Sequence, residues 1–225
     1  MKYRGVVLFG GSFDPVHHGH LTMAAFAMDY VQADRLIFIP ASRSPHKTAS
    51  PTATGQQRME MIRLAIADNP HFSVSEVELQ RPGKSYSVET VTYFRQQFGF
   101  ATPLYFILGL DAFREIDTWK EYAALFGLCH FIIMTRPGSG KNFSPAYLPV
   151  ELAGNFCYDN QKGGYVHGSG FAVFPKEITA LDISSTRIRE NLQKGFSIRY
   201  LLPSAVEDFI YRNGLYQTKD IESIG

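Results

Sequence analysis

The sequence has little excess charge of either sign. Its 225 residues include 22 lysines and arginines against 21 aspartates and glutamates, which leaves a formal net charge of +1 at pH 7. Domains that bind nucleic acid usually carry a clear basic excess, because neutralising phosphates supplies much of their affinity. The balance of charges therefore argues against a nucleic-acid partner.

Cysteines and long apolar runs are also scarce. The two cysteines, Cys129 and Cys157, build no disulfide framework and lack the spacing of a metal finger. No apolar stretch approaches the roughly 20 residues that a membrane-spanning helix needs. The apolar run near the N-terminus is too short for a signal peptide. We therefore expect a cytoplasmic protein that does not enter a membrane.

Short β-rich apolar runs alternate with helical patterns along most of the chain. This alternation is typical of parallel βαβ units, whose right-handed crossovers build one doubly wound sheet. We therefore expect an α/β fold with a mostly parallel sheet and helices on both faces. Strands are predicted at 5–9, 35–39, 72–77, 104–108, 130–134 and 171–174, and helices at about 18–31, 55–67, 87–97, 118–126, 184–193 and 204–213.

The segment 137–170 interrupts this alternation, because it is rich in glycine and polar residues. We interpret it as an insertion or long loop, at about 138–170, within a single domain that spans 1–225. A short helix is expected near 149–154. Loops of this length are often functional or mobile, so residues 141–170 could form a lid, an oligomer contact or a segment without structure. The sequence leaves open whether the chain is a homo-oligomer.

A glycine turn and a histidine pair follow the first predicted strand, in the segment GGSFDPVHHGH at 10–20. Open α/β sheets bind ligands at the carboxyl ends of their strands. Gly10 and Gly11 let the backbone turn sharply and let a ligand approach closely. The start of the next helix suits an anion, because unpaired N–H groups and the positive end of the dipole lie there. His17 and His20, three residues apart, would share one helix face.

Two other interpretations of these histidines compete with a phosphate site. Together with His18 they could bind a metal, but the segment offers only Asp14 as a further ligand, so we predict no protein-bound metal centre. They could also be ordinary helix-cap and packing residues. Known phosphate loops do not explain the chain, because GxGxxG is absent from this segment and Lys141 precedes Asn where a Walker loop needs Ser or Thr.

A second candidate anion site lies in LDISSTRIRENL, at 181–192. Three hydroxyl residues at 184–186 are suited to cap the helix that follows. Arg187 and Arg189 fall in its first turn, where a cation is unfavourable against the helix dipole unless an anion shares the space. A capped helix whose exposed arginines pair with Asp182 or Glu190 explains the same pattern without a ligand.

These two segments resemble the two signatures of the HxGH nucleotidyltransferase superfamily. His17 and His20 match the histidines of the first signature, and ISSTRIR matches the second, ISSTxIR, with Arg189 as its final arginine. The resemblance implies a Rossmann-like fold with ATP bound over the first signature and its phosphates held by the second. The ATP-binding residues that it implies are Gly10, Gly11, Ser12, Phe13, Gly109, Asp111, Ile183, Ser184 and Ser185.

The middle of the chain resembles the bacterial nicotinate-nucleotide adenylyltransferases. PASRSPHK at 40–47 is similar to their PxxxxPHK loop, and RPGKSYSVET at 81–90 to their RxGxSYTxDT segment, with Ser87 and Glu89 in place of Thr and Asp. The resemblance covers nearly the whole chain except about 141–170 and the last few residues. The acceptor-binding residues that it implies are Lys47, Ser85, Tyr86, Trp119 and Arg136.

The resemblance implies transfer of AMP from ATP to nicotinate mononucleotide. The acceptor phosphate is already an anion, so its attack on the α-phosphorus needs no general base and no covalent intermediate. Catalysis would be alignment and charge stabilisation. The catalytic residues would be His17, His20, Lys47 and Arg189. Magnesium, Mg2+, would accompany ATP through its phosphates. Alternatives are nicotinamide mononucleotide or phosphopantetheine as acceptor, or a nucleotide sensor without turnover.

Overall fold

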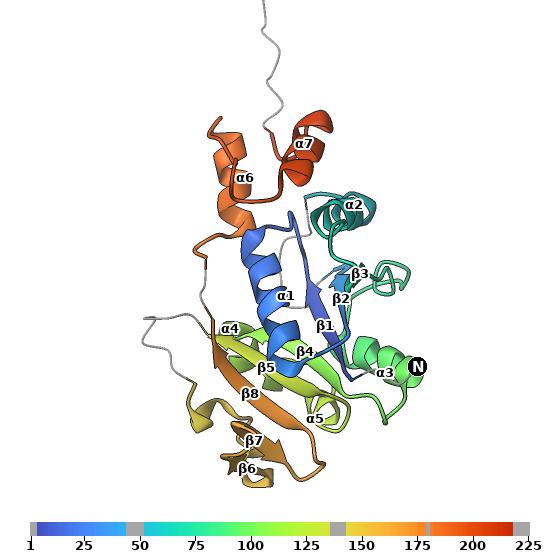
Figure 1. The fold of residues 1–225 in the computed structure, drawn as a ribbon, viewed down its shortest axis with the longest axis vertical. Coiled ribbons are helices and arrows are strands. Elements are labelled where there is room, and N and C mark those ends of the chain that lie inside the picture. The colour runs from blue at the N-terminus through green and yellow to red at the C-terminus, as the bar shows by residue number, and fades with distance from the viewer. Residues whose placement is uncertain (1–3, 44–51, 136–142, 179–180, 218–225) are drawn as a thin grey trace, which may run out of the picture.

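The computed structural model describes residues 4–43, 52–135, 143–178 and 181–217, and one eight-stranded sheet runs through them (Figure 1). The strands lie in the order β3-β2-β1-β4-β5-β8-β7-β6. Neighbours from β3 to β8 are parallel, and β7 and β6 continue the sheet in antiparallel pairing. The strands are β1 (Val6–Gly11), β2 (Arg35–Pro40), β3 (Phe72–Val74), β4 (Leu104–Gly109), β5 (His130–Thr135), β6 (Phe156–Asp159), β7 (Gly164–His167) and β8 (Ala172–Glu177).

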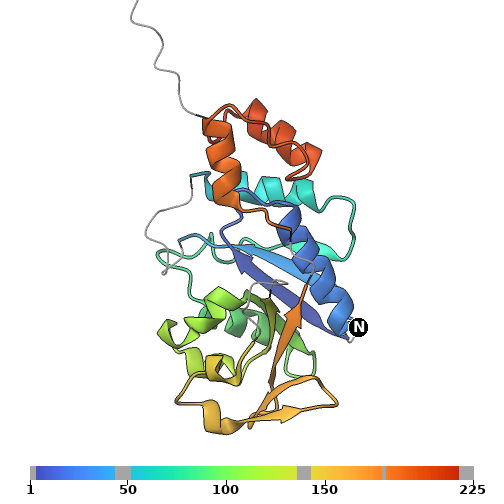
Figure 2. The ribbon, with the colours of Figure 1, turned by 90° about the vertical axis from the view of Figure 1, so that its left-hand side faces the viewer.

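Helices cover both faces of this sheet, so the predicted fold class is confirmed. Figure 2 shows α1 on one side of the strands and the green helices on the other. The α-helices are α1 (His18–Val31), α2 (Gly55–Ala65), α3 (Ser87–Phe98), α4 (Leu110–Arg114), α5 (Tyr122–Leu125), α6 (Ser185–Gln193) and α7 (Ser204–Arg212). Short 3-10 turns occupy η1 (Ile116–Thr118), η2 (Pro145–Tyr147) and η3 (Ala153–Asn155).

The alternation of side chains along each strand divides the core into two clusters. Val7 and Phe9 of β1 pack in the cluster that α1, α2, α6 and α7 share, whereas Val6 and Leu8 pack against α3, α4 and α5. Parallel strands buried on both faces read as continuous apolar runs, which is why VVLF and LIFI lack polar positions. The central strands are therefore fixed between two helical layers.

The helix predicted at 118–126 is wrong. The chain forms the 3-10 turn η1, passes through Trp119 in an extended conformation, and restarts as the four-residue α5. Glu121 adopts a φ of +50°, a left-handed conformation that a continuous α-helix cannot contain. The strand predicted at 72–77 is also shorter, because β3 ends at Val74.

The polar segment before β8 contains a β-hairpin that the sequence did not reveal. β6 and β7 have four residues each, and β7 pairs with β8. Asp159 closes the turn, since its Oδ1 accepts hydrogen bonds from the backbone N–H groups of Gln161 and Lys162. Position 164 requires glycine, because a Cβ there would lie 2.8 Å from the Val173 carbonyl oxygen. Instead of the helix expected near 149–154, the chain forms η2 and η3.

Arg95 of α3 ties together the chain segments that lead into β4 and β5. Its guanidinium is buried and donates to the Leu128 carbonyl oxygen through Nε and Nη2, at 2.9 and 2.6 Å. Nη1 donates to the carbonyl oxygens of Gly99 and Thr102, at 2.8 Å each. One side chain thus satisfies three main-chain acceptors from two separate chain segments.

We expect Arg95→Leu to lower the free energy of unfolding by roughly 3 kcal/mol or more, because partly or fully buried carbonyl groups lose their donors. Urea denaturation measures the change. Arg63→Leu on α2 is the matched control, since Arg63 is half exposed and forms only an exposed pair with Glu60, and should cost less than about 1 kcal/mol. Equal losses in the two variants would contradict this role of Arg95.

Candidate active site

The carboxyl ends of the parallel strands meet at one edge of the sheet. From β1 the chain moves outward to β2 and β3, and then returns to β4 on the other side of β1. Open α/β sheets bind their ligands where the strand order reverses in this way. The end of β1 at Gly10–Gly11 and the end of β4 at Gly109, followed by Asp111 on α4, lie at this point.

The turn between β1 and α1 is folded tightly around one aromatic ring. Phe13 is buried, has a φ of +48°, and packs its ring against Phe9 and Phe38 at centroid distances of 5.3 and 5.5 Å. A Cβ at Gly11 would lie 2.9 Å from that ring, so the close approach requires glycine. The Phe13 ring also contacts the ring of His20 edge to face, with the two centroids 5.0 Å apart.

The two candidate histidines stack on each other at the start of α1. Their ring centroids are 3.7 Å apart with an interplanar angle of 29°. His17 is the N-cap residue and is buried, while His20 is partly exposed in the first turn. Gly19 lies against this pair, since a Cβ there would come within 3.0 Å of His17 Nδ1. The structure therefore brings the two histidines together at the amino end of a 14-residue helix.

Asp14 is the buried centre of the same turn, with 4% of its surface exposed. Its Oδ2 accepts a hydrogen bond from the backbone N–H of Thr52 at 2.7 Å. Its Oδ1 accepts from the backbone N–H of Ala53 at 3.1 Å and from the hydroxyl of Tyr216 at 2.7 Å. Both oxygens are therefore engaged by protein donors. Within the described residues, no group of three or more His, Cys, Asp and Glu side chains could hold a metal ion.

Arg58 of α2 supports the turn from the inside. Only 2% of its surface is exposed, and Nη1 donates to the Ser12 carbonyl oxygen at 2.7 Å while Nε donates to that of Ala53 at 3.3 Å. Burial lowers the pKa of Arg58, and the nearby Asp14 carboxylate opposes this shift. A guanidinium keeps its charge even so, which leaves a cation directly behind the candidate phosphate turn.

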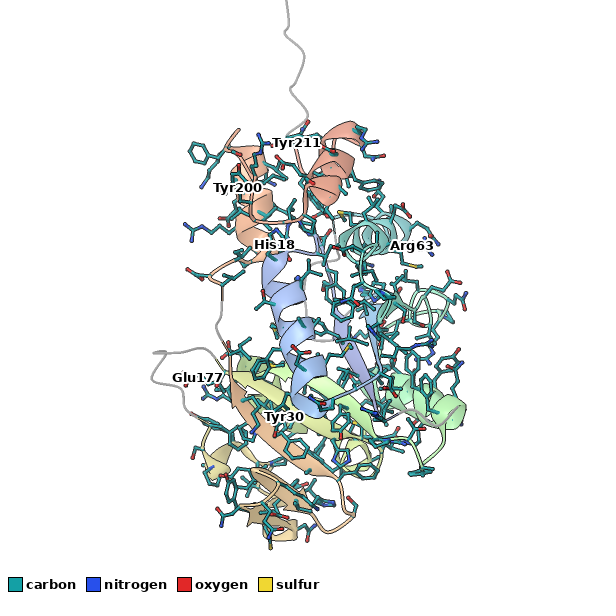
Figure 3. The ribbon with its side chains drawn as sticks, viewed as in Figure 1. His18, Tyr30, Arg63, Glu177, Tyr200 and Tyr211 are labelled. Carbon is teal, nitrogen blue, oxygen red and sulfur yellow. The ribbon has the colours of Figure 1, made fainter. Side chains whose placement is uncertain are left out.

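Helix α6 begins beside this turn, so the two candidate phosphate segments are in direct contact. Figure 3 labels His18 at the start of α1, next to the base of α6. The Ser185 hydroxyl donates to the Pro15 carbonyl oxygen at 2.8 Å, across 170 positions of sequence. Arg189 Nη1 donates to the Asp14 carbonyl oxygen at 2.6 Å. Ser184 caps α6, as predicted, by accepting from the Arg187 N–H at 3.2 Å.

The two arginines of α6 have different surroundings. Arg187 forms an exposed ion pair with Asp182 at 3.9 Å, which is the ligand-free interpretation of this segment. Arg189 instead turns inward, with 26% of its side chain exposed, and also donates to the Thr186 hydroxyl at 3.2 Å. The inward arginine is the one that matches the second signature.

The candidate acceptor residues come together from two further segments. The Ser85 hydroxyl, largely buried, accepts from the backbone N–H of Ser42, and Tyr86 is the N-cap residue of α3. Lys120, next to Trp119, lies 4.8 Å over the Tyr86 ring and 2.8 Å from the Glu89 carboxylate. The Trp119 segment is thereby held against the start of α3. Lys47 and Arg136 lie outside the described residues.

Three buried polar residues around these segments were missed by the sequence interpretation as functional candidates: Arg58, Glu78 and Tyr216. Asp14 was considered only as a metal ligand. Glu78 accepts a 2.6 Å hydrogen bond from the Thr90 hydroxyl, and its burial raises its pKa against the opposing hydrogen bonds of Thr90 and Ser85. Their hydrogen-bond partners are distant in sequence, so no local spacing of residues indicates that these side chains belong to the site. The one local signal was a charged residue between apolar ones, as Glu78 is between Val77 and Leu79, and Tyr216 offered no signal of that kind.

Comparisons with known proteins agree on one family. The family model described as cytidylyltransferase-like matches residues 8–191. A protein of Citrifermentans bemidjiense is 46% identical over 209 residues, 93% of this chain and 96% of the relative. One of Syntrophotalea carbinolica is 43% identical over 213 residues, 95% and 97% of the two chains. Both carry the name "Probable nicotinate-nucleotide adenylyltransferase".

Solved structures show the same fold at low sequence identity. Plasmodium falciparum nicotinic acid mononucleotide adenylyltransferase complexed with NaAD superposes with a TM-score of 0.71 at 18% identity, covering 94% of this chain and 97% of that one. The same protein complexed with APC gives a TM-score of 0.70 at 19% identity, covering 94% and 96%. The likeness extends over almost the whole chain.

We expect Gly11→Ala to destabilise the turn, because the added Cβ would meet the packed Phe13 ring. The free energy of unfolding should fall by about 1–3 kcal/mol, as in other overpacked sites, and thermal denaturation measures it. The imidazole NMR signals of His20, which rests on Phe13, should shift. Gly154→Ala, at a glycine with open space around it, should change stability by less than about 0.5 kcal/mol; similar losses in both would count against the packing argument.

Proposed function

The chain belongs to the nicotinate-nucleotide adenylyltransferases, and we propose that it transfers AMP from ATP to nicotinate mononucleotide in NAD biosynthesis. The products are nicotinate adenine dinucleotide, or deamido-NAD, and pyrophosphate. The observation that carries this proposal is the direct contact between the β1–α1 turn and the start of α6, through Ser185 and Arg189. Two anion-binding segments from opposite ends of the chain form one site there.

ATP lies over the β1–α1 turn in this proposal. Gly10 and Gly11 allow its phosphates to approach the main chain at Ser12 and Phe13, and the amino end of α1 faces them. The amide groups of Ser184 and Ser185, with the Arg189 guanidinium, hold the β- and γ-phosphates. Two helix dipoles then point their positive ends at one triphosphate. The adenosine ribose reaches Gly109 and Asp111 across the point where the strand order reverses.

Catalysis proceeds by direct in-line displacement. A phosphate oxygen of nicotinate mononucleotide forms a bond to the α-phosphorus of ATP as the bond to the bridging oxygen breaks, and pyrophosphate leaves with that electron pair. His17 and His20 contact α- and β-phosphate oxygens, where negative charge grows in the transition state. Lys47 steadies the attacking phosphate or the triphosphate. The protein supplies alignment and preorganised positive charge, and no covalent enzyme intermediate forms.

Magnesium enters this reaction as part of the ATP substrate. Asp14, the carboxylate in the same turn as the histidines, already accepts three hydrogen bonds, which makes it a poor metal ligand. Magnesium usually binds through substrate phosphates and few protein carboxylates. We therefore assign Mg2+ to the triphosphate oxygens and the charge of Arg189 and the helix termini to the protein.

The acceptor binds against the start of α3 and the Trp119 segment. Ser85 and Tyr86 meet the pyridine ring, Trp119 stacks on it, and Arg136 is a further contact of the acceptor. The contacts of Ser85 with Ser42 and of Lys120 with Tyr86 hold these groups in one place. We place the enzyme in the cytoplasm with small-molecule substrates and no nucleic-acid partner. None of the described helices is long and apolar enough to cross a membrane.

Removing the His20 imidazole should slow turnover and spare ATP binding. We expect His20→Ala to lower kcat on the order of a hundred-fold or more, the usual cost of one transition-state contact. Calorimetric affinity for a non-hydrolysable ATP analogue should stay within about tenfold. His71→Ala is the matched control and should turn over normally, because His71 is exposed and its imidazole Nδ1 lies 3.1 Å from the Asp34 carbonyl oxygen, on a different strand edge from the histidine pair. Near-normal turnover of His20→Ala would overturn the assigned role.

A panel of acceptors tests the substrate. Pyrophosphate release with ATP should show the highest kcat/KM for nicotinate mononucleotide, followed by nicotinamide mononucleotide, with phosphopantetheine at background. A preference for either of the other acceptors would contradict the proposed substrate. Binding of ATP without release in the presence of any acceptor would indicate a sensor instead of an enzyme.

A further inference from the structure

The last described residues of the chain reach back into the β1–α1 turn through one phenol. We propose that Tyr216 is a positioning residue of the ATP site, which it serves through Asp14. The inference rests on the proposed function, since it concerns how that site is held in shape. Tyr216 belongs to neither signature and follows α7, 202 positions after Asp14.

The contact between these two residues is short and shielded from water. The Tyr216 hydroxyl donates to Asp14 Oδ1 at 2.7 Å, and only 6% of Tyr216 and 4% of Asp14 are exposed. A hydrogen bond to a buried carboxylate is among the stronger neutral-to-charged bonds in proteins. Burial and the negative charge of Asp14 raise the pKa of Tyr216, so the phenol keeps its proton and remains the donor.

The backbone is strained on both sides of this contact. Tyr216 has a φ of +65°, and Phe13, which precedes Asp14, has a φ of +48°. Bulky residues rarely adopt left-handed conformations, and they persist where surrounding contacts hold them. Gly214, also at positive φ, lets the chain turn after α7 so that the Tyr216 ring enters the interior. The hydrogen bond therefore joins two turns that depend on tertiary contacts for their shape.

Asp14 transmits this constraint to the candidate phosphate contacts. Its carbonyl oxygen accepts from Arg189, the inward arginine of α6. Its neighbour Phe13 makes an edge-to-face ring contact with His20. A shift of Asp14 would therefore move both the histidine and the arginine sides of the site. Displacements near 1 Å at a reacting centre can cost about a hundred-fold in rate, so a looser Asp14 should be measurable in kcat.

Tyr216→Phe is the decisive variant, because it removes one oxygen and keeps the buried ring. We expect kcat per folded molecule to fall about tenfold, while KM for nicotinate mononucleotide stays within about twofold of the wild-type value. Folded fractions come from far-UV circular dichroism at 10 °C on the same samples. If Tyr216 acts through Asp14, Asp14→Asn combined with Tyr216→Phe should be no more than about twofold slower than Asp14→Asn alone.

Two control variants separate positioning from stability. Tyr211→Phe changes a partly exposed tyrosine of α7 and should leave kcat unchanged. Val206→Ala removes buried methyl groups from the same helix without touching Asp14, so it should lower Tm while kcat per folded molecule stays normal. A Tyr216→Phe enzyme that behaves like Val206→Ala would overturn the proposal, as would fully multiplicative losses in the double variant.

Binding measurements keep this test separate from the proposed function. Calorimetry with a non-hydrolysable ATP analogue needs no turnover, and Tyr216→Phe should weaken that affinity by about threefold to tenfold. Absence of turnover in the wild-type protein would refute the proposed reaction and leave this comparison intact. Unchanged analogue affinity and unchanged kcat in Tyr216→Phe would refute the positioning role alone.

Discussion

One buried carboxylate organises this molecule. Removing Asp14 from water is unfavourable unless its oxygens are hydrogen-bonded, and the donors come from distant parts of the chain: the Thr52 and Ala53 amides before α2 and the Tyr216 phenol after α7. The same turn receives Arg58 from α2 and Arg189 from α6. The position of the candidate phosphate site is thus set by the requirement to satisfy a single charge.

The site that results is made largely of main chain and cations. Glycines let the backbone approach a ligand, α1 and α6 present their amino ends, and Arg58 and Arg189 lie behind and beside the turn. Such an arrangement attracts a polyphosphate without a protein metal ligand, and it suits an acceptor that brings its own negative nucleophile. The rest of the sheet, including the β6–β7 hairpin at the far end (Figure 1), supports this edge from a distance.

Particular elements show why some features could be predicted from sequence. Helix α1 begins at His18 and ends at Val31, as expected, because a glycine turn precedes an uninterrupted apolar pattern. The continuous helix predicted at 118–126 was wrong, since the left-handed conformation of Glu121 leaves no mark on the periodicity of the sequence. The β6–β7 hairpin was missed because four-residue strands among polar residues give too short a pattern. Arg58 and Tyr216 were missed because their partners lie 46 and 202 positions away.

The sequence by itself determined the chemistry available: glycines and histidines after the first strand, a capping hydroxyl and arginines at the start of α6, and the order of strands and helices that puts both segments at the same sheet edge. Tertiary structure decided how these groups are used. It turned Arg189 inward and left Arg187 paired with Asp182 at the surface, although the two lie only two residues apart near the start of one helix. The physical reason is that a guanidinium can be buried there only if it donates a hydrogen bond to the Asp14 carbonyl oxygen. That hydrogen bond joins residues 175 positions apart in the sequence.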